Sequence, residues 1–122
     1  MQGKRLDRVG HLIQMELSRL VPHRLKDPRV TGLITITHVS VAADLRSARV
    51  FYSVIGANEK ALQDIQEGLQ SAAGFLQREV SSVVEMRYTP KFTFQLDETY
   101  ERSMEIDRVL HRLEKENPPS ES

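Results

Sequence analysis

The chain has 122 residues, 39% of them hydrophobic and 28% charged, which is typical of one folded domain and argues against a disordered or fibrous chain. It has no cysteine, which excludes disulfides, thiolate nucleophiles and sulfur-ligated metals and suits a reducing, cytoplasmic location. No apolar run approaches the length of a membrane span, and the charged N-terminal stretch lacks the pattern of a signal peptide.

Charge is distributed unevenly, although the 17 basic and 17 acidic residues cancel. Residues 1–96 carry 13 Lys/Arg and 9 Asp/Glu, whereas residues 97–122 carry 4 and 8. A mildly basic body is therefore followed by an acidic C-terminal segment. Such asymmetry is a weak indication that nucleic acid is a partner.

The first twenty positions predict an amphipathic helix, because apolar residues recur at three- and four-residue steps. The expected buried stripe consists of Leu6, Val9, Ile13, Leu17 and Leu20. Pro22 and the Asp27-Pro28 pair are expected to end this helix, since proline has no amide hydrogen to donate.

Two strands follow, at Leu33–Val41 and Ala48–Ile55, and both are rich in β-branched residues. The apolar phase of the first strand changes partway, which predicts a β-bulge near Thr37 and His38 that restores one buried face. The short link between the strands predicts a hairpin.

A long helical period runs from Asn58, the expected N-cap, to about Met86. Three small residues, Ala72, Ala73 and Gly74, interrupt it, so we expect two helices joined at a sharp kink. Gly74 is expected to adopt unusual backbone angles or to make a close contact that a side chain would prevent.

Residues 91–97 alternate as a third strand, and a last helix is expected to carry Ile106, Val109, Leu110 and Leu113. The predicted organisation is a domain over residues 1–97, a C-terminal helix over 98–116 and a disordered tail over 117–122.

This order of elements predicts an α+β domain with a three-stranded mixed sheet and helices on one face. The third strand is expected to lie parallel to the first. The other face of the sheet is expected to be polar, with Thr35, Arg49, Ser53, Lys91, Thr93 and Gln95. The arrangement resembles the type II K-homology domain, which binds RNA.

Motifs for catalysis are scarce. Four histidines are expected on different elements, and none has the spacing of a metal-binding pair: His11, His23, His38 and His111. The acidic stretch that begins at Asp97 and Glu98 is better explained as a solvated helix start than as a catalytic site. We therefore expect no enzyme, no metal and no cofactor.

Basic residues are more informative. Lys4, Arg8 and Arg19 fall opposite the apolar stripe of the first helix, and further cations follow in the loop and after the kink. Those further cations are His23, Arg24, Lys26, Arg29 and Arg78. They predict phosphate binding only if they converge in space, and each alone is better explained as part of an ordinary solvated surface.

Three segments resemble the ribosome-binding factor A family. They read KDPRVTGLITITHVSVAADLRSARVFYS (residues 26–53), GLQSAAGFLQREV (68–80) and MRYTPKFTFQLD (86–97). The resemblance covers roughly residues 5–113 in the order and spacing of the family. It implies a type II K-homology-like fold in which an Ala-x-Gly kink replaces the usual GxxG loop.

The resemblance also implies a cytoplasmic factor that binds the immature small (30S) ribosomal subunit and helps its 16S ribosomal RNA to mature, notably in the cold. Other assembly factors are implied as partners, and the free protein is expected to be a monomer. The family pattern is matched at Arg5, Arg8, Arg29, Arg46, Arg87 and Pro90. It is not matched at Gln77, where arginine is common, or at Ser103, where glycine is usual.

The sequence therefore predicts a non-catalytic RNA-binding protein. The predicted RNA-binding residues are Arg5, Arg8, Arg24, Arg29, Arg46, Ala73, Gly74, Arg78, Arg87 and Lys91. The alternative is a protein-interaction module on which the basic residues are incidental.

Overall fold

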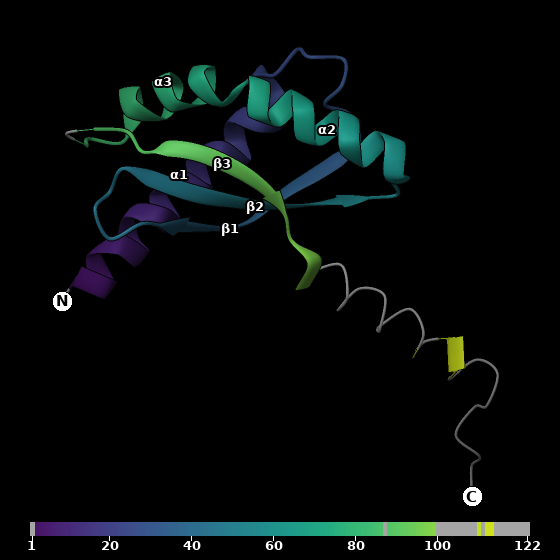
Figure 1. Cartoon of the computed structure of the whole chain (residues 1–122), viewed down its shortest axis with the longest axis horizontal. Coiled ribbons are helices and arrows are strands. Elements are labelled where there is room, and N and C mark those ends of the chain that lie inside the picture. Colours follow the sequence, from purple (N-terminus) through teal and green to yellow (C-terminus); the bar gives the residue numbers. More distant parts are fainter. Residues whose placement is uncertain (1, 87, 100–109, 111, 114–122) are drawn as a thin grey trace, which may run out of the picture.

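The computed structural model describes residues 2–86, 88–99, 110, 112 and 113. Its elements are α1 (Gln2–Arg24), β1 (Leu33–Val41), β2 (Ser47–Ile55), α2 (Glu59–Ser71), α3 (Ala73–Val83) and β3 (Lys91–Leu96) (Figure 1). The C-terminal helix and tail expected from the sequence lie mostly outside the described residues, so those two expectations remain predictions. Among the described helices, none has the length and apolar character that a bilayer crossing requires.

The three strands form one mixed sheet in the order β1-β2-β3. β1 is antiparallel to β2, and β3 is parallel to β2. The expectation that the third strand lies beside the first was wrong. A chain that leaves the end of β2 and returns through helices starts its next strand in the direction of β2, so β3 pairs with that strand.

The predicted β-bulge in β1 is confirmed. Ile36 pairs with Tyr52 and His38 pairs with Phe51, which leaves Thr37 as the extra residue. Because of this insertion, Ile36 and Val39 both face the core, at 4% and 5% exposure.

Helix α1 is longer than the sequence indicated, because it continues through Pro22 to Arg24. Pro22 stands in the last turn, where the lost amide removes a single hydrogen bond and the helix ends two residues later. Within α1, Gly10 lies against β1: a Cβ built on it would stand 2.7 Å from the carbonyl oxygen of Val39. A side chain at this position would push the helix away from the strand.

The core lies between the helices and one face of the sheet. Its most deeply buried side chains come from α1, α2, α3, β2 and β3 and include Ile13, Leu17, Leu20, Val50, Tyr52, Ile65, Leu69, Leu76, Val80, Phe92 and Phe94. The opposite face is exposed at Thr35, Arg49, Lys91, Thr93 and Gln95, as the alternation predicted.

Ser53 departs from that pattern, because it is 2% exposed, and its hydroxyl has no hydrogen-bond partner among the residues that the structure describes. Asp97, the first residue after β3, continues the parallel pairing with β2 near Ser53. The amide of Asp97 donates to the carbonyl of Tyr52 (2.7 Å), and its carboxylate accepts from the hydroxyl of Thr37 (2.6 Å). That second bond connects β3 to β1 across β2.

The predicted N-cap and kink are confirmed. The Asn58 side chain accepts a hydrogen bond from the amide of Ala61 (2.9 Å) and starts α2. Ala72 separates α2 from α3, and its amide donates to the carbonyls of Gly68 and Leu69, both at 3.1 Å. Helix α3 ends at Val83, three residues before the predicted limit.

Candidate nucleic-acid interface

Four predicted RNA-binding residues lie at one end of the sheet. The first turns of α1 rest against the end of β1, since Leu6 and His11 line the same hollow as Val39 and Val41. Arg5 and Arg8 are exposed on these turns. On the neighbouring strands, the amide of Lys91 donates to the carbonyl of Arg46 (3.0 Å), so these two exposed cations are also adjacent in space.

The turn that carries Arg46 has a defined conformation. The amide of Leu45 donates to the carbonyl of Ala42 (2.9 Å), and the carboxylate of Asp44 accepts from the amide of Arg46 (3.0 Å). Leu45 adopts φ 62°, a left-handed conformation that is uncommon for a side chain of this kind. The backbone of Arg46 is therefore fixed, while its side chain points into solvent.

A second group lies at the kink. Gly74 is exposed in the first turn of α3, and the nearest atom to a Cβ built on it is Nη1 of Arg78, at 3.7 Å. The expectation that Gly74 has unusual angles or a close internal contact was wrong: its φ is not positive, and the space beside it is open. Ala73 belongs to the core at 7% exposure, so Gly74 is the small residue that faces outward.

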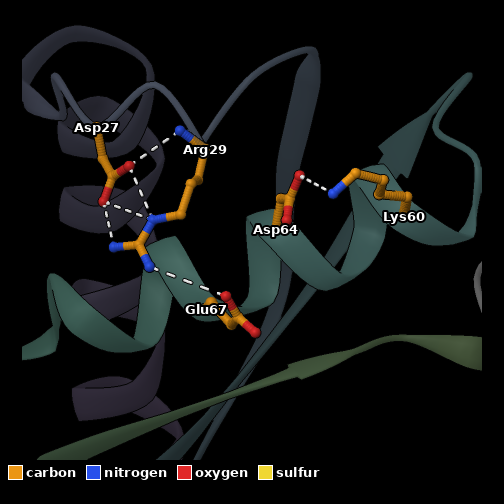
Figure 2. Close-up of polar contacts among 5 residues, drawn as sticks. All are labelled: Asp27, Arg29, Lys60, Asp64 and Glu67. Atoms are coloured by element: carbon orange, nitrogen blue, oxygen red, sulfur yellow. Dashed lines mark hydrogen bonds and ion pairs between the residues drawn. The ribbon is translucent and has the colours of Figure 1, made fainter.

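Arg24 and Arg29 are held in ion pairs, and Figure 2 shows those of Arg29. Arg29 binds the carboxylate of Asp27 through Nη2 at 2.7 Å and through Nε, and its Nη1 lies 3.9 Å from Glu67 of α2. Hydrogen bonds from the side chain and the amide of Arg29 lower the pKa of Asp27 to about 2. In return, the Asp27 carboxylate raises the pKa of Arg29. Arg24 binds Glu79 of α3 at 3.0 Å.

The predicted set thus falls into three groups. Arg5, Arg8, Arg46 and Lys91 gather at the sheet end, Gly74 and Arg78 lie at the kink, and the third group is Arg24, the last residue of α1, with Arg29 in the loop that follows. Within the described part of the chain, the five cations of the first two groups have no ion pair. Arg87 lies outside the described residues.

A row of glutamines lies along the outer edge of β3 and was not predicted from the sequence. Gln70 donates to the carbonyl of Phe92 (3.1 Å) and accepts from the amide of Phe94 (3.0 Å). Gln66 donates to the carbonyl of Phe94 (2.8 Å), and Gln77 accepts from the amide of Phe92 (3.3 Å). This glutamine row (Gln66, Gln70 and Gln77) satisfies four backbone groups that an edge strand would otherwise expose. The only signal in the sequence was a set of polar residues one position away from buried Ile65, Leu69 and Leu76.

Two histidines come closer than the sequence indicated. His11 of α1 and His38 of β1 line one hollow, together with Asp7 and Gln14. Because α1 extends to Arg24, His11 and His23 also share a helix, contrary to the expectation of separate elements. Among the described residues, no group of three or more His, Asp or Glu side chains is placed to hold a metal ion.

Comparison with known proteins identifies the family. The model of the family described as ribosome-binding factor A matches residues 5–110. The chain belongs to the ribosome-binding factor A family. It is 41% identical to the ribosome-binding factor A of Acetivibrio thermocellus, over 96% of this chain and 94% of that protein. It is 40% identical to that of Clostridium novyi, over 89% of each chain.

Solved structures with this name share the fold. The crystal structure of ribosome-binding factor A from Thermus thermophilus superposes with a TM-score of 0.63 at 22% identity, covering 75% of this chain and 94% of that one. The solution structure of a ribosome-binding factor A-like protein from Thermotoga maritima gives 0.63 at 26% identity, covering 72% and 82%. A Thermus thermophilus homology model fitted into a cryo-electron microscopy map of a complex with 30S gives 0.50 at 23% identity, covering 69% and 90%. The expected α+β, K-homology-like fold is confirmed.

Proposed function

We propose that the protein binds the small (30S) ribosomal subunit and, without catalysing a reaction, assists the maturation of its 16S ribosomal RNA. Membership of the ribosome-binding factor A family over residues 5–110 is the observation that carries this proposal. The Thermus thermophilus relative, whose homology model was fitted into a map of a complex with 30S, supports the same partner.

The geometry supplies a surface for RNA. Arg5, Arg8, Arg46 and Lys91 are exposed at one end of the sheet and are available to bind phosphates. At the kink, Gly74 presents no side chain, so an RNA backbone can approach the start of α3 beside Arg78. Arg87, by its place in the chain between α3 and β3, completes this proposed set.

Binding assists maturation by favouring one RNA conformation. A protein that binds one of two RNA structures more tightly shifts their equilibrium toward that structure. The contribution is largest in the cold, where misfolded RNA rearranges slowly. We further propose that the protein acts in the cytoplasm, is a monomer when free and works beside other assembly factors.

Sedimentation of the tagged protein tests the proposal. We expect it to migrate with small subunits rather than with complete ribosomes, and we expect co-purification to disappear after nuclease digestion. Migration away from small subunits would overturn the proposal. Co-purification that survives nuclease would favour the alternative of a protein-interaction module, for which exposed Leu33 and Ile55, paired on the open sheet face, are the candidate contact.

A further inference from the structure

The last residue of α1 and the segment that connects α1 to β1 contact α2 and α3 on both sides of the kink. Arg24 binds Glu79 of α3 at 3.0 Å, seven residues after Ala72. Arg29 approaches Glu67 of α2 at 3.9 Å, five residues before Ala72. The two helices are therefore linked through a third segment, in addition to their covalent junction.

Backbone and side-chain hydrogen bonds hold this segment in one shape. The carboxylate of Asp27 accepts from the amide of Arg29 (2.9 Å), from its Nε (3.1 and 3.2 Å) and from its Nη2 (2.7 Å) (Figure 2). The amide of Val30 donates to the carbonyl of Asp27 (3.0 Å) and closes the turn. Arg29 cannot swing outward without losing the side-chain bonds to this carboxylate.

The same segment rests on a helical glycine. A Cβ built on Gly68 of α2 would lie 2.6 Å from Cγ2 of Val30 and 3.3 Å from Cβ of Arg29. Gly68 is buried, although glycine weakens a helix interior by about 1 kcal/mol relative to alanine. The position is thus occupied by the one residue that leaves room for the loop.

The charge around the loop does not favour phosphate. Arg24 and Arg29 face three carboxylates, those of Asp27, Glu67 and Glu79. A phosphate at either guanidinium would have to displace or lie beside these acids, and like charges at such distances repel.

We infer that Arg24 and Arg29 are positioning residues that brace the kink, and that neither is a phosphate contact. The brace, defined as Arg24, Asp27, Arg29 and Val30 against Glu67, Gly68 and Glu79, fixes the angle at which α3 presents Gly74 and Arg78. This inference rests on the proposed RNA-binding function. When the brace is broken, only a fraction of the molecules keep the angle between α2 and α3 that allows binding. The apparent dissociation constant is then the intrinsic one divided by that fraction.

Removal of Asp27 distinguishes a phosphate contact from a positioning role for Arg29, because the two roles predict opposite changes in affinity for small subunits. In an Asp27→Ala variant the guanidinium of Arg29 is freed and the protein gains one positive charge. If Arg29 contacted phosphate, binding to purified small subunits would tighten. The brace predicts that binding weakens, by roughly tenfold if a tenth of the molecules keep the competent angle.

Salt dependence and a matched control complete this test. Arg29→Gln should weaken binding without changing the slope of log K against log salt, whereas loss of a phosphate contact flattens the slope by about 0.7–0.9. Lys60→Gln removes one charge from the Lys60–Asp64 pair, which lies within α2 and links no other element (Figure 2). Binding by this control should stay within about twofold of wild type, since exposed helical pairs contribute little. Tighter binding by Asp27→Ala, or a flattened slope in Arg29→Gln, would overturn the inference.

A second measurement does not depend on ribosome binding. The chain has no cysteine, so spin labels at Gln63→Cys and Ser82→Cys report the distance between α2 and α3 alone. Gly68→Ala leaves the net charge unchanged but forces the loop away, and we expect it to broaden this distance distribution, as Asp27→Ala should. An unchanged distribution in both variants would overturn the brace. If wild-type protein fails to bind small subunits while the variants still broaden the distribution, the proposed function fails and the brace stands.

Discussion

At the scale of single residues, the Asp27–Arg29 pair shows that the geometry of an ion pair determines how much it contributes to stability. Most exposed pairs contribute little, because two long side chains must be ordered in water. Here the partners are two residues apart, the contact is bidentate, and the carboxylate also accepts the amide of Arg29. The backbone turn orders the pair before the side chains meet, so less conformational entropy is lost.

Acid titration tests this pair. The pKa of Asp27 in the folded protein is about 2, below the ordinary value of 3.8, so its contribution to stability is complete above about pH 5 and is lost as the pH falls toward 2. We expect the free energy of unfolding to fall less steeply between pH 4 and pH 2 in Asp27→Asn than in the wild-type protein. Urea unfolding of both proteins at several pH values measures this free energy.

Asp44→Asn is the matched control for the loss of one carboxylate, because Asp44, like Asp27, lies in a connecting segment and accepts the amide of an arginine two residues later, that of Arg46. Identical pH profiles for Asp27→Asn and the wild-type protein would contradict the role assigned to the pair.

At the scale of elements, the glutamine row explains how α2 and α3 stay on the edge of β3 on both sides of the kink. Gln66 and Gln70 come from α2 and Gln77 from α3, and all three bind the backbone of Phe92 or Phe94. Their amides take the place of a neighbouring strand, because a carboxamide offers one donor and one acceptor group, as a peptide does.

Loss of Gln70 should destabilise the domain. In Gln70→Ala the amide of Phe94 and the carbonyl of Phe92 lose their partner, and we expect a cost of about 1–3 kcal/mol in chemical unfolding. Gln63→Ala, at an exposed position of the same helix, should stay within about 0.5 kcal/mol of wild type. Equal effects of the two substitutions would show that the row does not hold the edge.

Substitution of Gly74 by alanine is expected to stabilise the domain, in contrast to the loss of Gln70. Its backbone is compatible with a side chain and the space beside it is open, so Gly74→Ala should stabilise the free protein by about 0.5–1 kcal/mol. A bulkier Gly74→Val should weaken binding to small subunits with little change in melting temperature, because the lost space is on the outer surface. A large drop in melting temperature for Gly74→Ala would mean that the glycine serves the fold.

The features of the fold that the sequence predicted best were the two local breaks, the β-bulge in β1 and the junction between α2 and α3. The bulge at Thr37 follows from a shift in the apolar pattern, and the junction at Ala72 follows from three small residues in the middle of an overlong helical period. Both signals are properties of adjacent residues. The neighbour of β3 and the extension of α1 past Pro22 were predicted wrongly, because they depend on how whole elements pack. The glutamine row was missed for the same reason, since polar residues leave no periodic signal.

At the scale of the whole molecule, the net charge of zero does not show that the cations the structure describes fall into two kinds: those exposed without an ion pair and those paired with carboxylates. Composition indicated only a mildly basic body. The structure groups Arg5, Arg8, Arg46 and Lys91 at one end of the sheet and keeps Arg78 at the kink. Which cations converge, and which are neutralised by carboxylates from other helices, depends on tertiary contacts that spacing along the chain does not encode.

The most direct test of the central claim is the salt dependence of binding to purified small subunits at constant magnesium. If the five exposed cations bind phosphates, the slope of log K against log salt should be about −3 to −4, and each single change to glutamine should flatten it by about 0.7. Arg112→Gln, at an exposed position of the acidic C-terminal segment, should leave the slope unchanged. Affinity that does not depend on salt, or an equal loss in Arg112→Gln and Arg8→Gln, would contradict RNA binding by this surface.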